Sequence, residues 1–105
     1  MKKTLLTTLL LAFVITGCNR PSEQTISDFE VSDEKISKYL DQLDDPNTST
    51  DQKKKILCTD YPLEYKENYM PNLLKISPQD YTKEKLLADL DTALNYYKEK
   101  ENIRC

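Results

Sequence analysis

The side chains that could carry covalent chemistry are three cysteines, Cys18, Cys58 and Cys105. The chain has no histidine, so it lacks a histidine general base, a histidine partner for a nucleophilic serine or cysteine, and a histidine metal ligand. No two cysteines have the C-x-x-C spacing of a redox site. The single glycine, Gly17, cannot supply a glycine-rich phosphate-binding loop. We therefore predict that the protein is not an enzyme and needs no cofactor.

Oxygen-bearing side chains are the other candidates for chemistry. Four residues at alternating positions resemble the first four ligand positions of an EF-hand calcium loop: Asp45, Asn47, Ser49 and Asp51. The EF-hand loop has glycine at its sixth position and glutamate at its twelfth, where this chain has Thr50 and Ile56. We expect a loop followed by a helix cap, and no metal site.

The beginning of the chain has the layout of a secretory signal. Two lysines precede an apolar run that is too short to span a bilayer comfortably, and small residues lead to Cys18. The last four residues of this stretch, Ile15-Thr16-Gly17-Cys18, resemble the lipobox of bacterial lipoproteins. The resemblance implies that residues 1–17 are a signal peptide and that the Cys18 thiol carries a diacylglycerol. It also implies acylation of the new amine, and several acyl chains hold a protein on a membrane essentially permanently.

The resemblance also bears on location and on the other cysteines. Asn19 replaces the aspartate that retains such lipoproteins at the inner membrane, which implies the outer membrane, facing the periplasm. With Cys18 occupied by lipid, Cys58 and Cys105 remain, and two such cysteines pair in an oxidising compartment. The alternative for this pair is a redox or intermolecular thiol.

The rest of the chain predicts helices. Residues 18–30 are expected to be the lipidated N-terminus and a polar tether, with the flexible part at 19–28, and residues 31–105 a small helical domain. Apolar residues recur at helical spacing, and cap residues and prolines set the boundaries. We predict an all-α fold, a small bundle of three to four short helices closed by one disulfide, with helices over residues 32–43, 50–59, 61–70 and 82–101 and an irregular or single-turn segment at 72–77.

Cap residues are expected at five positions. Ser32, Ser49, Asp60 and Thr82 are predicted to cap the beginnings of the four helices, because a side-chain oxygen there can accept a free backbone N–H. Asn102 is expected in the left-handed conformation at the end of the last helix. The basic run Lys53-Lys54-Lys55 is expected on a solvated helix face, with contact to anionic lipid or glycan as the alternative.

Two groups of residues are candidates for binding a partner. Tyr61, Tyr65 and Tyr69 recur every four residues and therefore share one helix face, which either covers the core or contacts another protein. The acidic residues Asp41, Asp44 and Asp45 crowd the carboxyl end of the first predicted helix, where the helix dipole disfavours negative charge. They form either a solvated surface or a recognition site.

Charge narrows the class of partner. Cleavage before Cys18 would leave 13 basic minus 18 acidic residues, or −5, and an acidic protein does not follow a phosphate backbone, so we expect no nucleic acid partner. The prediction is a membrane-anchored envelope lipoprotein that binds another envelope protein, as an accessory, an inhibitor or an immunity-type protein. The alternative is a helical lipoprotein that binds a small ligand or a lipid, which an enclosed apolar cavity would favour.

The anchor and the disulfide are tested together by intact mass under non-reducing conditions, on protein purified from the membranes of an expressing Gram-negative cell. We expect the mass of the chain from Cys18, plus acyl groups, less two hydrogens. A mass without acyl groups, or one with free thiols at Cys58 and Cys105, would contradict the prediction.

Overall fold

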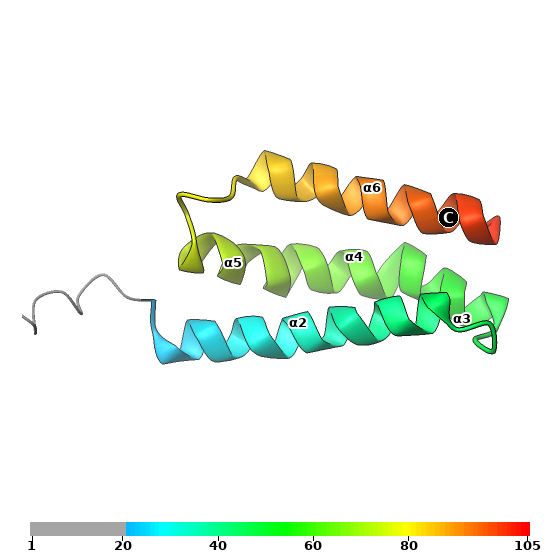
Figure 1. Ribbon diagram of the computed structural model, residues 1–105, viewed down its shortest axis with the longest axis horizontal. Helices are drawn as coiled ribbons and strands as arrows, with labels where there is room; N and C mark the ends of the chain where they lie inside the picture. Colours follow the sequence, from blue (N-terminus) through cyan, green and yellow to red (C-terminus); the bar gives the residue numbers. More distant parts are fainter. Residues whose placement is uncertain (1–20) are drawn as a thin grey trace, which may run out of the picture.

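The structure is a computed structural model that describes residues 21–105. The lipobox-like residues, Cys18 and Asn19 lie outside the described part. The described chain folds into three helical rods (Figure 1). The first is α2 (Glu23–Asp44), and the last is α6 (Lys83–Glu101). The middle rod runs through α3 (Thr50–Lys55), the π turn η2 (Ile56–Asp60), α4 (Tyr61–Glu64), the π turn η3 (Tyr65–Tyr69) and α5 (Met70–Ile76). The predicted all-α fold is confirmed.

The first rod begins earlier than the sequence analysis predicted. Ser22 is its cap, and its hydroxyl accepts the backbone N–H of Thr25 at 3.1 Å. Ser32, the predicted cap, lies inside the helix and is 1% exposed. The prediction of a flexible tether is therefore wrong for residues 23–28. The added turns bring Phe29 against the core, where its ring centroid lies 5.1 Å from that of Tyr69, and such packing stabilises a helix more than local propensity does.

The middle rod is continuous where two helices and an irregular segment were expected. A proline lacks an N–H, and its ring clashes with the carbonyl four residues before it. Each π turn ends directly before an X-Pro pair: Tyr61 N–H bonds to the carbonyl of Ile56, and Met70 N–H bonds to that of Tyr65. These wider turns let the rod pass Pro62 and Pro71 without a break. The predicted cap Asp60 is consequently an ordinary helical residue.

The other predicted caps are confirmed. Ser49 Oγ accepts the N–H of Gln52 at 3.1 Å at the beginning of α3. Thr82 Oγ1 accepts the N–H of Lys85 at 3.2 Å at the beginning of α6. Asn102 ends α6 in the left-handed conformation, at φ 56°.

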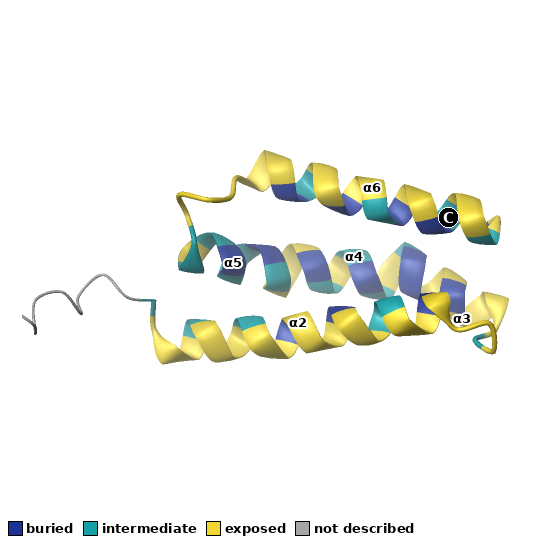
Figure 2. Ribbon diagram, viewed as in Figure 1, coloured by how far each residue is buried: buried dark blue, intermediate teal, exposed yellow. Residues whose placement is uncertain are grey.

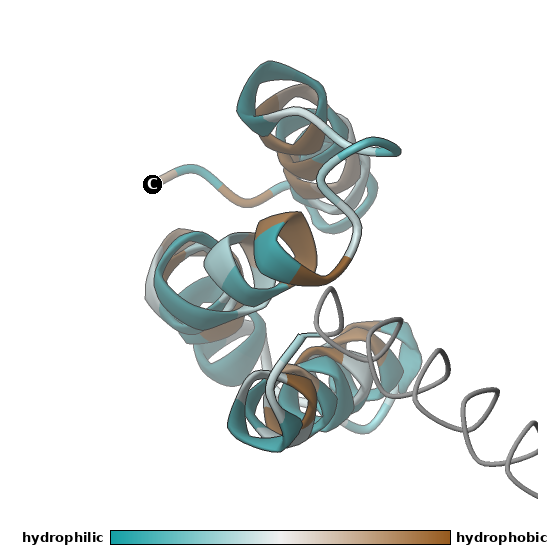
Figure 3. Cartoon of the chain, turned by 90° about the vertical axis from the view of Figure 1, so that its left-hand side faces the viewer, coloured by the Kyte–Doolittle hydropathy of each residue, from teal (hydrophilic) through white to brown (hydrophobic). Residues whose placement is uncertain are grey.

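The middle rod lies between the other two rods and contacts both (Figure 1). The apolar faces of the three rods turn toward one another (Figure 3). The buried residues form inward-facing stripes, while the outer faces are exposed (Figure 2). The most deeply buried apolar side chains are Leu43, Ile56, Leu57 and Leu90. Among the helices of residues 21–105, none has the length and apolar character needed to cross a membrane.

The predicted disulfide is present between Cys58 and Cys105, whose Cα atoms lie 5.6 Å apart. It joins the last residue of the chain to the π turn η2 of the middle rod. Ile103, in the tail after α6, is 6% exposed and packs with the core. The tail is thus fixed by a covalent bond and by an apolar contact.

The double variant Cys58→Ser/Cys105→Ser is expected to lose roughly 4 kcal/mol of free energy of unfolding, because the bond restricts a long loop in the unfolded chain. Urea unfolding followed by circular dichroism measures this loss. The wild-type chain treated with a reductant should lose the same amount. A loss below about 1 kcal/mol would mean that the bond adds little to the packing of the tail.

Candidate functional site

The predicted tyrosine face is turned into the core. Tyr61 is 5% exposed and Tyr65 is 7% exposed, and the Tyr65 hydroxyl donates to the carbonyl of Leu86 in α6 at 2.8 Å. Tyr69 is half-buried, with its ring stacked on Tyr65 at 5.0 Å. Burial raises the pKa of all three phenols. Tyr61 and Tyr65 therefore pack in the core, as the packing alternative predicted, and partner binding by the tyrosine face stays a prediction.

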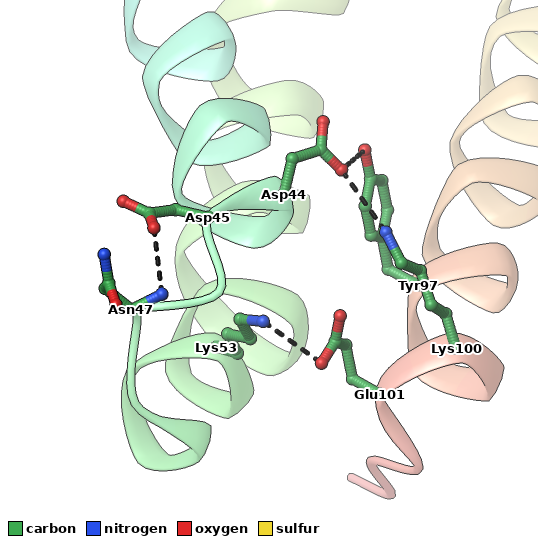
Figure 4. A network of polar contacts seen from close by, with 7 residues as sticks. All are labelled: Asp44, Asp45, Asn47, Lys53, Tyr97, Lys100 and Glu101. Carbon is green, nitrogen blue, oxygen red and sulfur yellow. Dashed lines mark hydrogen bonds and ion pairs between the residues drawn. The ribbon is translucent and has the colours of Figure 1, made fainter.

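The three candidate aspartates lie at the carboxyl end of α2 and are exposed. Asp44 Oδ1 accepts the hydroxyl of Tyr97 at 3.0 Å and lies 3.7 Å from Lys100 Nζ (Figure 4). Asp45 Oδ1 accepts the backbone N–H of Asn47 at 2.9 Å, which shapes the turn that follows. Asp44 and Asp45 thus bond to other parts of the fold while remaining exposed, and Asp41 is exposed on the same end of α2.

A second polar contact fastens the same end of the molecule. Lys53 Nζ donates to Glu101 Oε1 at 3.1 Å, and the Lys53 side chain is 9% exposed (Figure 4). The expectation of a solvated Lys53 is therefore wrong, because the carboxyl end of α6 covers it. Together with Asp44 and Tyr97, this pair joins α6 to both α2 and α3.

The negative charge of the domain is concentrated on α2. This helix carries two lysines and seven acidic residues, or −5, while residues 21–105 carry 12 basic and 18 acidic residues, or −6. All seven acidic side chains of α2 are exposed: Glu23, Asp28, Glu30, Asp33, Glu34, Asp41 and Asp44. Most of the net charge therefore lies on one rod, which spans about 33 Å at the standard helical rise.

A polar groove runs beside this acidic helix. It has a volume of about 320 Å³, is open to solvent, and is lined by α2 and the middle rod: Asp28, Val31, Ser32, Lys35, Glu64, Asn68 and Asn72. Lys35 Nζ lies 3.8 Å from Glu64 Oε1, and the Glu64 side chain is 11% exposed. Val31 is 53% exposed at this groove. The Ser32 hydroxyl is buried and has no hydrogen-bond partner within the described residues.

This groove was not predicted from the sequence, because the first part of α2 was expected to be a tether. A signal was nevertheless present in the sequence. Ser22 precedes Glu23 and Thr25, as at a helix N-terminus, and Phe29 lies at helical spacing from Ile36.

The chain matches no protein-family model, and no curated protein or solved structure matches it. Within residues 21–105, no group of three or more histidine, cysteine, aspartate or glutamate residues could hold a metal ion. The EF-hand-like set is a turn and a cap, in which Asp45 and Ser49 bond to backbone N–H groups.

The contact between Tyr97 and Asp44 predicts how stability depends on pH. Burial, and then the hydrogen bond to Asp44, raises the pKa of Tyr97 from 10.0 to about 12. The unfolded chain therefore releases this proton at lower pH than the folded chain. The contribution of Tyr97 to stability is complete below pH 10 and is lost as the pH rises to about 12.

Between pH 10 and pH 12 the free energy of unfolding of the wild type should fall as the pH rises, in part because Tyr97 ionises more readily in the unfolded chain. Tyr97→Phe removes this ionisation, so its free energy of unfolding should fall less steeply, by up to about 1.4 kcal/mol per pH unit. Urea midpoints measured across this range test the prediction. An unchanged slope would show that the Tyr97 hydroxyl ionises alike in both states.

Proposed function

We propose that this protein is a lipid-anchored lipoprotein of the cell envelope that binds another protein and has no enzymatic activity. It acts as an accessory subunit, an inhibitor or an immunity-type protein. The lipobox-like residues before Cys18 support the anchor. The charge of the described domain supports the choice of a basic protein as partner.

The observation that carries this proposal is the −5 charge of α2 on an exposed helix face. The domain neutralises little of this charge. Lys100 of α6 lies 3.7 Å from Asp44, and Lys38 lies 3.9 Å from Glu34, and exposed pairs of this kind contribute little energy. A face of one sign attracts a partner of the opposite sign and speeds its association.

The anchor would hold this face near the membrane surface. Because α2 begins at Glu23, residues 18–22 are all that separate the proposed lipid from the first helical turn. Five extended residues span at most about 18 Å. The partner is therefore sought among envelope proteins at the membrane, where the acidic helix stands close to the lipid headgroups.

The ligand-binding alternative receives less support. An acyl chain or an apolar ligand needs an enclosed apolar cavity. The groove beside α2 is open to solvent, and so is one beside the disulfide that is lined by Cys58, Thr59, Pro62, Leu63 and Lys66. The interface of rods is filled by leucine, isoleucine and tyrosine side chains.

The test is recovery of a partner by crosslinking in membranes, followed by purification of the full chain and identification of what is bound. The triple variant Glu30→Gln/Asp33→Asn/Asp41→Asn removes three exposed charges from α2. We expect it to lower the association rate at least about tenfold at low salt and to weaken the salt dependence.

The matched control is Glu67→Gln/Asp91→Asn/Glu99→Gln, which removes the same charge from exposed positions of the other two rods. It should retain most of the association rate. Equal effects of the two triple variants, or the absence of any specifically recovered protein, would contradict the proposal.

A further inference from the structure

The groove beside α2 offers more hydrogen-bond acceptors than donors. Asn68 Nδ2 donates to Glu64 Oε2 at 3.1 Å, and Asn72 Nδ2 donates to the carbonyl of Asn68 at 2.8 Å. Both carboxamide nitrogens are thus directed into the helix that carries them. Their oxygens have no hydrogen bond within the described residues and remain as acceptors.

Two further groups add to this surplus. Asp28 accepts Gln24 Nε2 at 2.7 Å through Oδ1, which leaves Oδ2 without a described partner. Ser32 is one of the residues that line the groove, it is 1% exposed, and its hydroxyl has no hydrogen-bond partner within residues 21–105. A buried polar group without a partner is costly, so a ligand that supplied a hydrogen bond to this hydroxyl would gain binding energy.

The cationic donor in the groove is Lys35, and its ion pair with Glu64 is weak. Its Nζ lies 3.8 Å from Glu64 Oε1, beyond hydrogen-bond distance, and its side chain is 55% exposed. The Glu64 carboxylate is far less exposed, at 11%. A better cation can therefore displace Lys35 into solvent and take its place at Glu64.

We propose that this groove receives the guanidinium group of an arginine side chain carried by the partner protein. The inference rests on the proposed function and names the group that the partner presents. A guanidinium has five N–H donors in a fixed plane and no acceptor, which complements a groove with two carboxylates, two amide oxygens and a hydroxyl. The exposed Val31 at the same groove can contact the methylene stem of the arginine.

Arginine fits these acceptors better than lysine does. Lysine would bring three donors around one point charge, whereas the acceptors here belong to side chains on two different rods. The planar fork of a guanidinium directs its N–H donors to several sides at once, which suits acceptors that come from more than one rod. The groove is therefore expected to distinguish the two cations.

The test uses the full chain in detergent micelles, labelled with ¹⁵N, and N-acetyl-arginine N-methylamide as the probe. The side-chain amide signals of Asn68 and Asn72 report on the groove. We expect saturable shifts of these signals with the arginine probe. The citrulline analogue has the same shape without the charge and should bind at least about tenfold more weakly, since hydrogen bonds to charged groups are the stronger ones. The lysine analogue should also bind more weakly than arginine.

Variants separate the groove from general electrostatics. Glu64→Gln should weaken the arginine probe at least about tenfold, whereas Glu67→Gln removes the same charge from an exposed position of the same rod and should change little. Lys35→Gln should strengthen binding severalfold, because it removes the competing cation. This exposed substitution also keeps the test valid if Glu64→Gln disturbs the fold.

Equal shifts with arginine and citrulline, equal effects of Glu64→Gln and Glu67→Gln, or weaker binding by Lys35→Gln would each overturn the inference. Its failure is distinguishable from that of the proposed function. A partner that binds Glu64→Gln and Lys35→Gln as it binds the wild type, but not the α2 triple variant, would leave the function standing without the arginine site. Binding of the arginine probe without any recovered partner protein would leave the arginine site standing and contradict the proposed function.

Discussion

The last rod is connected to the rest of the fold at its two ends and along one face. At one end a short loop joins it to α5, and at the other end the bond between Cys58 and Cys105 ties the final residue to the middle rod. The leucines of α6 supply a narrow apolar face between these ends. Small domains bury a small fraction of their surface and depend on such added constraints. The bond lies beside the Lys53–Glu101 pair and the Tyr97–Asp44 contact, so the end of the molecule that carries it is the most firmly fastened.

The middle rod can pack against both other rods along its length because it is a continuous helix. The π turns before Pro62 and Pro71 keep it in one line, and they also set where its side chains point. Tyr61 and Tyr65 then face inward, and the Tyr65 hydroxyl finds the carbonyl of Leu86 as a buried partner. The chain has two phenylalanines and no tryptophan, so tyrosine rings supply most of the large aromatic side chains that fill the core.

The surface follows a different logic from the core. At the carboxyl end of α2, Asp44 stabilises the fold through its contact with Tyr97. Most of the other acidic side chains of α2 are exposed and take no part in this contact. The groove lies toward the other end of the same helix, where α2 approaches the middle rod through Ser32. A small residue at this position leaves room between the rods for the proposed arginine side chain. The contacts that stabilise the fold and the proposed arginine groove thus lie toward opposite ends of α2.

Local signals in the sequence determined the helical class and the caps Ser49, Thr82 and Asn102. The pairing of Cys58 with Cys105 followed from the cysteine count once Cys18 was assigned to lipid. A cap is a hydrogen bond between residues three apart, so it can be read from neighbouring positions. The candidate aspartates were correctly expected on the surface, but the sequence did not distinguish Asp41 from the structural Asp44 and Asp45.

Only the tertiary structure decided which faces are buried. It extended α2 to Glu23 through the contact between Phe29 and Tyr69, turned Tyr61 and Tyr65 inward, and covered Lys53 with the end of α6. It also formed the groove, whose residues come from α2 and from the middle rod. The physical reason is that burial is a property of two surfaces in contact, and a periodic pattern on one helix does not specify the surface that will cover it.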